Sequence, residues 1–151
     1  MAVFEDLKKD LVQALKGKEA DRALTLRMLL AAIHNEQIAK GKANELTEED
    51  VLGVLRREAK KRREAADIYT KAGRGELADK ENGELEIIKS YLPAELSEAE
   101  VGSIIREVLA GGETNFGKVM GQVMAKLAGR AEPGRVSELV KQALSEEMGE
   151  S

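Results

Sequence analysis

The chain has 151 residues, a formal net charge of −4, no cysteine and a single histidine, His34. The absence of cysteine excludes disulfides, thiol nucleophiles and cysteine-bound metal centres, and one histidine excludes a multi-histidine metal site, so we predict no metal and no cofactor. Because the whole molecule is mildly acidic, nucleic-acid binding would require a local basic patch.

Apolar residues recur at helical spacing along almost the whole chain, and no stretch alternates as a strand would. Aromatic residues are scarce, so the core must consist of aliphatic side chains, alanine and methionine, which favour helices. The sequence therefore predicts an all-α protein: an N-terminal bundle of about four helices followed by a small three-helix C-terminal domain. The predicted domains are residues 1–92 and 96–149, and residues 93–95 form a proline-containing hinge.

The first domain is expected to begin with two helices, over residues 3–15 and 21–39. An apolar stripe on the first of them contains Phe4, Leu7, Leu11 and Leu15. The second is apolar around much of its surface between Ala23 and Ile33, which predicts the central and most buried helix of this domain. Residues 41–44 then make a polar break.

A third helix is expected from an N-cap at Thr47 to about Ala72, with acidic residues in its first turn, where the helix dipole favours them. A fourth helix carries an apolar set of Leu77, Leu85, Ile88 and Leu92. Pro93 marks the domain boundary, because proline disfavours the helical conformation in the residue before it.

Three short helices are expected after this boundary, over residues 97–109, 115–127 and 133–148. Ser97 and Glu100 have the spacing of a capping box, in which each side chain bonds the other residue's backbone N–H. Pro133 suits the first position of the last helix, since that position needs no backbone N–H.

The strongest run of charge lies on the third helix and gives a second basic surface: Arg56, Arg57, Lys60, Lys61 and Arg63. Such a stripe can follow phosphates. The alternative, which we favour, is a solvated face balanced by acidic neighbours such as Glu64 and Asp67. Arg62 falls instead on the apolar stripe of this helix, which predicts a partly buried arginine paired with a carboxylate.

A second candidate region is the segment 115–124, which lies within the helix expected over residues 115–127. Its core stripe is expected to contain Phe116, Met120, Val123 and Leu127, which leaves polar residues on another side. Gly117 and Gly121 permit the close approach of another backbone, whether protein or RNA. The candidate RNA contacts are Lys118, Gln122, Lys126, Arg130, Arg135 and Lys141.

Several kinds of site find no support in the sequence. Val119 stands where a phosphate loop needs serine or threonine, His34 is expected to be a half-exposed structural residue, and no pair of carboxylates has a spacing that marks acid–base chemistry. We therefore predict a chain that is not an enzyme on its own. No apolar run is long enough to span a membrane and no secretory signal is seen, so we expect a cytoplasmic location.

Four pieces of the chain, in this order, resemble the YqeY family: residues 24–33, the basic run between Glu58 and Glu64, Tyr91-Leu92-Pro93, and Gly117-Lys118-Val119-Met120-Gly121. YqeY proteins are similar to the tail of GatB, the B subunit of the glutamine-dependent amidotransferase that acts on mischarged Asp-tRNA and Glu-tRNA. In that family the tail is helical and contacts the outer corner of the tRNA.

The resemblance implies a C-terminal unit that contacts tRNA through Lys118, Gln122, Lys126 and Arg130, whereas the catalytic part of the B subunit has no counterpart here. The leading hypothesis is a tRNA-binding accessory protein, which assists an amidotransferase or an aminoacyl-tRNA synthetase or acts alone. The alternative is a helical protein–protein interaction module associated with such an enzyme. An independent carbon–nitrogen ligase that uses glutamine as amide donor is the least favoured, because no nucleophile is arranged for that chemistry.

Overall fold

The computed structural model describes residues 2–41, 45–147 and 149, and within them it contains seven α-helices and no strand. The prediction of an all-α protein is confirmed. The chain divides into two compact units, Met1–Pro93 and Ala94–Ser151, and each has a hydrophobic core of its own. None of the helices in the described part of the chain is long and apolar enough to cross a membrane.

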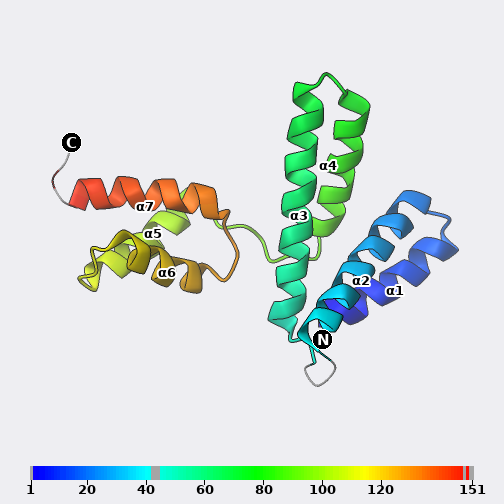
Figure 1. The fold of residues 1–151 in the computed structure, drawn as a ribbon, viewed down its shortest axis with the longest axis horizontal. Helices are drawn as coiled ribbons and strands as arrows, with labels where there is room; N and C mark the ends of the chain where they lie inside the picture. Colours follow the sequence, from blue (N-terminus) through cyan, green and yellow to red (C-terminus); the bar gives the residue numbers. More distant parts are fainter. Residues whose placement is uncertain (1, 42–44, 148, 150–151) are drawn as a thin grey trace. The chain divides into compact units, whose positions relative to one another are not determined.

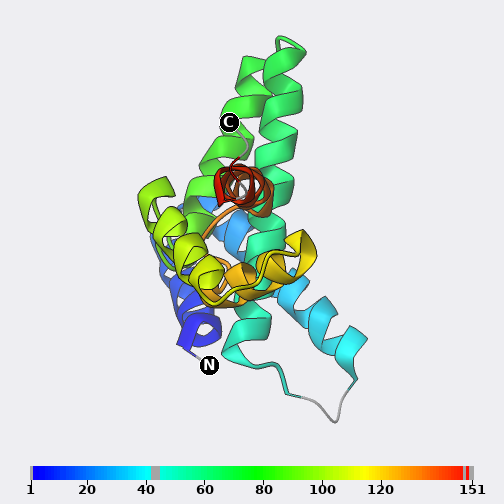
Figure 2. The ribbon, with the colours of Figure 1, turned by 90° about the vertical axis from the view of Figure 1, so that its left-hand side faces the viewer.

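The first unit contains two helical hairpins, built from α1 (Ala2–Lys16), α2 (Ala20–Lys40), α3 (Glu48–Lys71) and α4 (Gly75–Lys89). Helices α3 and α4 lie side by side in both views (Figures 1 and 2), and α2 contacts each of the other three helices. The largest fully buried side chains come from all four helices and are Leu7, Leu26, Leu29, Ile33, Leu55 and Ile88.

A capping box begins α3, and an ion pair links it to the end of α2. The Thr47 hydroxyl accepts from the backbone N–H of Asp50 at 3.0 Å, and the Asp50 carboxylate accepts from the N–H of Thr47 at 2.9 Å. Lys40 also donates to Asp50 at 2.6 Å. This bond and the one from Thr47 lower the pKa of Asp50 to about 2. Of the break predicted at residues 41–44, only Gly41 lies within the described residues.

The structure corrects the expected burial of α1 and α2. Leu15 is exposed, and Ala14 takes its place in the core. Helix α2 contributes Leu26, Leu29 and Ile33 to the core, but it is not buried all round, because Leu24 and Met28 are exposed. The physical reason is that α2 has apolar side chains on two sides, and its neighbours cover only one of them.

The fourth helix also differs from expectation. Leu77 is exposed at its N-terminal end, where Ala78 faces the core instead. Leu92 lies beyond the helix, which ends at Lys89, although Leu92 still packs against the core of the first unit.

The second unit contains α5 (Glu98–Ala110), α6 (Phe116–Leu127) and α7 (Pro133–Glu147), and each of these helices contacts the other two. The capping box of Ser97 and Glu100 and the position of Pro133 as first residue of α7 are both confirmed. The predicted end of this helix at Met148 lies outside the described residues. The core of the second unit consists mainly of aliphatic side chains: Val101, Ile105, Val108, Leu109, Val119, Val123, Leu127, Val136 and Val140.

The core stripe predicted for α6 is wrong at two positions. Phe116 is exposed and Met120 is only half-buried, whereas Val119 is completely buried beside Val123 and Leu127. Both choices have helical spacing, so the pattern alone does not decide between them. The buried set places Phe116 at the surface, at the first residue of the helix.

Candidate functional site

One exposed side of α6 carries polar and small residues in two adjacent lines. Lys118, Gln122 and Lys126 follow one another at four-residue spacing, Gly117 and Gly121 lie beside them, and all five are exposed. We call these five residues the α6 face. A Cβ atom added at Gly121 would meet nothing within 4 Å, so the surface is open there. The helix contains no acidic residue, so its exposed charges are all positive.

The N-terminal end of α6 adds an aromatic ring to this surface. The Asn115 side chain caps the helix by accepting from the N–H of Lys118 at 3.0 Å. Phe116 follows, 37% exposed, and the Lys141 ammonium lies 5.6 Å from the centre of its ring. An exposed ring of this kind offers a flat surface on which a nucleobase can stack.

Carboxylates limit the positive charge of the second unit. Glu113 lies just before α6, and the N–H of Asn115, followed by that of Thr114 and the charge of Lys118, lowers its pKa. Lys126 pairs with Glu107 at 3.6 Å. Acidic residues outnumber basic ones over Ala94–Ser151. The α6 face is therefore a local positive surface on an acidic unit.

Arg130 and Arg135, two of the predicted contact residues, bond other parts of the second unit. Arg130 Nε donates to the carbonyl of Ala94 at 2.9 Å, and the N–H of Leu96 donates to the carbonyl of Arg130 at 2.7 Å. Arg135 bonds the carboxylates of Glu98 and Glu138, and these bonds raise its pKa, that with Glu98 most. Arg130 thus fastens the segment before α5 to the α6–α7 loop, and Arg135 joins the start of α7 to that of α5.

On the second basic surface, ion pairs with neighbouring carboxylates offset much of the charge. These pairs have N···O distances of 2.6 to 4.0 Å and join Arg56 with Glu49, Arg57 with Glu36, Lys60 with Glu64, and Lys61 with Glu58. Arg63 is half-buried. This surface lies on α3 in the first unit, and the α6 face lies in the second.

Arg62 is buried between two carboxylates, as predicted for an arginine on the apolar stripe. It is 6% exposed, and its guanidinium donates to Glu58 at 2.6 Å and to Glu84 on α4 at 3.2 Å. Burial raises the pKa of Glu58, but hydrogen bonds from Lys61 and Arg62 outweigh this effect and hold the pKa below its usual value. Arg62 Nη2 also lies 3.9 Å from the sulfur of Met28 on α2.

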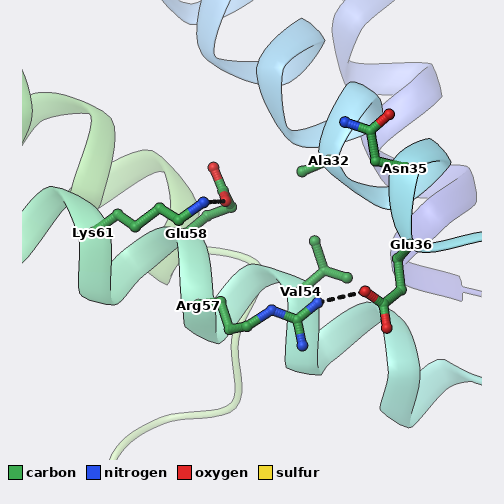
Figure 3. Close-up of a pocket in the computed structure, with 7 residues that line it drawn as sticks. All are labelled: Ala32, Asn35, Glu36, Val54, Arg57, Glu58 and Lys61. Carbon is green, nitrogen blue, oxygen red and sulfur yellow. Dashed lines mark hydrogen bonds and ion pairs between the residues drawn. The ribbon is translucent and has the colours of Figure 1, made fainter. Parts of the chain in front are cut away.

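A hollow between α2 and α3, shown in Figure 3, was not foreseen from the sequence. In the figure Arg57 reaches from α3 to Glu36 on α2, and Lys61 lies along α3 against Glu58. No local pattern marks the hollow, because its lining comes from two helices: Ala32, Asn35, Glu36, Val54, Arg57, Glu58 and Lys61.

Neither an ion site nor a catalytic histidine emerges from the geometry. Among the described residues, no three His, Cys, Asp or Glu side chains come together in a group able to hold a metal ion. His34 is exposed on α2, rather than half-exposed as expected.

Comparison with known proteins gives relatives in fungi. The chain is 34% identical over 91 residues to an uncharacterised protein of Schizosaccharomyces pombe, a match that covers 60% of this chain and 72% of that protein. It is 28% identical over 154 residues to "Altered inheritance of mitochondria protein 41, mitochondrial" of Pyrenophora tritici-repentis, covering 97% of this chain and 81% of the relative. The protein of the same name in Lachancea thermotolerans is 36% identical over 109 residues, 69% of this chain and 56% of the relative.

The names of two of these relatives place those proteins in mitochondria, so the cytoplasmic location of this chain stays a prediction. The family model for Yqey-like proteins matches residues 4–144, a range that overlaps both units and each of the helices α1 to α7. The resemblance seen in the four sequence pieces is thereby confirmed, and the chain belongs to the Yqey-like protein family.

Proposed function

We propose that this chain is a non-catalytic accessory protein that contacts tRNA through the α6 face. The observation that carries the proposal is an exposed side of α6 with two lysines, a glutamine and two glycines, on a helix that has no acidic residue of its own. Lysine and glutamine side chains donate to phosphate oxygens, and the glycines let a sugar–phosphate backbone come close to the helix. Phe116 lies at the N-terminal end of the same helix, where it can stack on an unpaired base.

The preference for tRNA rests on the family resemblance of this segment to the GatB tail, and not on geometry. The proposed partners are accordingly a tRNA and the amidotransferase or aminoacyl-tRNA synthetase that acts on it. We restrict the proposed contacts to fewer residues than the sequence suggested. Lys118, Gln122 and Lys126 form its centre, Lys141 lies near its edge beside Phe116, and Arg130 and Arg135 hold the unit together.

The test is a salt titration of tRNA binding by the whole chain. Each lysine that neutralises a phosphate contributes about one unit to the slope of log affinity against log salt. We therefore expect Lys118→Ala/Lys126→Ala to weaken binding and to reduce the slope by about two units. The matched control is Lys9→Ala/Lys80→Ala, which removes two exposed lysines from the first unit and should leave the slope unchanged.

Two results would contradict the proposal. One is equal affinity and equal slope for the α6 variant and the wild type, which would place the contact elsewhere. The other is equal affinity for tRNA and for an unstructured RNA of the same length, which would remove the preference for tRNA while leaving RNA binding in place.

A further inference from the structure

Around the hollow between α2 and α3, the two cations are more exposed than the carboxylates with which they pair. The Arg57 side chain is 59% exposed and its partner Glu36 is 24% exposed. The Lys61 side chain is 70% exposed and its partner Glu58 only 12%. Although each pair is neutral, a ligand that approaches this side therefore meets the positive groups first.

Apolar side chains extend the hollow in both helices. Ala32 and Val54 contribute its apolar lining (Figure 3). On α2, Met28 and Leu24 lie one and two helical turns before Ala32, and both are exposed. The contact between the Met28 sulfur and Arg62 places this line of α2 against α3.

On α3 the same face continues past Lys61. Ile68 lies two turns further along the helix and is 65% exposed. By this spacing, the exposed apolar residues lie on the same helix faces as the residues that line the hollow. Within the first unit, this gives a surface with both an apolar and a positive component.

We propose that this surface, the α2–α3 groove made by Leu24, Met28, Ala32, Arg57, Lys61 and Ile68, binds an acidic amphipathic helix of another protein. Leucine-like side chains of the partner would cover Met28 and Leu24, and its carboxylates would pair with Arg57 and Lys61. Charge complementarity identifies the partner as acidic, because its carboxylates meet two cations that are more exposed than the carboxylates of their own ion pairs. The exposed methionine suits a helix-binding surface, since its flexible side chain adapts to apolar ligands.

The same observations disfavour nucleic acid at this groove. RNA has phosphates for Arg57 and Lys61 but no aliphatic side chains to cover Leu24, Met28 and Ile68. The groove belongs to the first unit, so this inference is independent of tRNA binding at the α6 face.

The experiment uses the whole chain and a synthetic amphipathic peptide with leucines at helical spacing and glutamates on both flanks. Amide chemical shifts of the protein are followed during titration. We expect changes around Met28, Asn35, Arg57 and Lys61, and about tenfold weaker binding to Arg57→Glu/Lys61→Glu. A second peptide, with lysines in place of the glutamates, should bind this variant better than it binds the wild type.

The control variant Lys9→Glu/Lys80→Glu changes the net charge equally outside the groove and should bind the glutamate peptide as the wild type does. Met28→Gln tests the apolar component and should weaken binding without a change of charge. The proposal is overturned by equal binding of the two peptides to the wild type, by shift changes confined to other helices, or by no binding at millimolar peptide. Displacement of the peptide by tRNA, with shift changes at the same residues, would overturn it in favour of RNA.

Discussion

Arg62 joins α3 to α4 through a buried ion pair. Its planar guanidinium has donors on several sides, so one side chain can bond Glu58 on its own helix and Glu84 on α4. Both carboxylates are nearly as buried as the arginine itself. A neutral replacement would leave two carboxylates close together with little access to water.

We expect Arg62→Met to lower the free energy of unfolding by about 3–5 kcal/mol, the usual cost of removing one partner from a buried ion pair. Arg62→Lys should lower the free energy of unfolding by less, because lysine keeps the positive charge. It should still lower it, because lysine cannot bond both carboxylates in the same fixed geometry. Urea denaturation of the full chain measures both values.

The matched control for this prediction is Lys60→Met, two residues earlier on α3. Its pair with Glu64 is exposed and 4.0 Å long, and such pairs contribute about 0–1 kcal/mol. A similar loss of unfolding free energy for Lys60→Met and Arg62→Met would show that burial does not increase the contribution of the Arg62 ion pairs to stability.

At the scale of the helix, the start positions could be predicted from the sequence better than the side of each helix that is buried. The starts of α3, α5 and α7 depend on residues within one turn: Thr47 with Asp50, Ser97 with Glu100, and Pro133. The faces depend on distant neighbours. In α2 and α6 the apolar residues allow more than one buried side, and only packing against other helices left Met28 and Phe116 at the surface.

The role of Arg130 shows the same limit for the candidate site. In sequence it continues a basic line with Lys118 and Lys126, but its guanidinium bonds a backbone carbonyl 36 residues away. A backbone acceptor can belong to any residue, so no pattern of residue types reveals the partner. The sequence could indicate which residues were basic and exposed, but not which of them the fold already uses.

We expect Arg130→Ala to lower the stability of the second unit by about 1 kcal/mol, the typical net contribution of one hydrogen bond. It should also speed hydrogen exchange at the Leu96 amide, which bonds the Arg130 carbonyl. The salt slope of tRNA binding should stay as in the wild type. The reference is Lys118→Ala, which should reduce the slope and leave exchange at Leu96 unchanged. A reduced slope for Arg130→Ala would return this arginine to the contact set.

In the whole molecule, bonds anchor the chain on both sides of Pro93. Before it, the Tyr91 hydroxyl donates to Asp10 on α1 at 2.5 Å and accepts from Arg22 on α2 at 3.2 Å. Burial and the bond to Asp10 raise the pKa of Tyr91, so the phenol stays protonated and keeps this bond. After Pro93, Ala94 and Leu96 bond Arg130 in the second unit. The connection between the anchored ends is therefore short.

The two cores share no residue, which predicts that the units lose stability separately. Leu127 in the second core and Leu29 in the first are both fully buried, so truncation of either to alanine should cost about 2–5 kcal/mol. In Leu127→Ala, hydrogen exchange should speed up in α5, α6 and α7, while α1 to α4 keep their wild-type protection. Leu29→Ala should give the reverse pattern, because its packing partners lie in the first unit. Equal acceleration throughout the chain by either variant would show a single cooperative unit, and RNA contact by α6 would then depend on the integrity of the first unit as well.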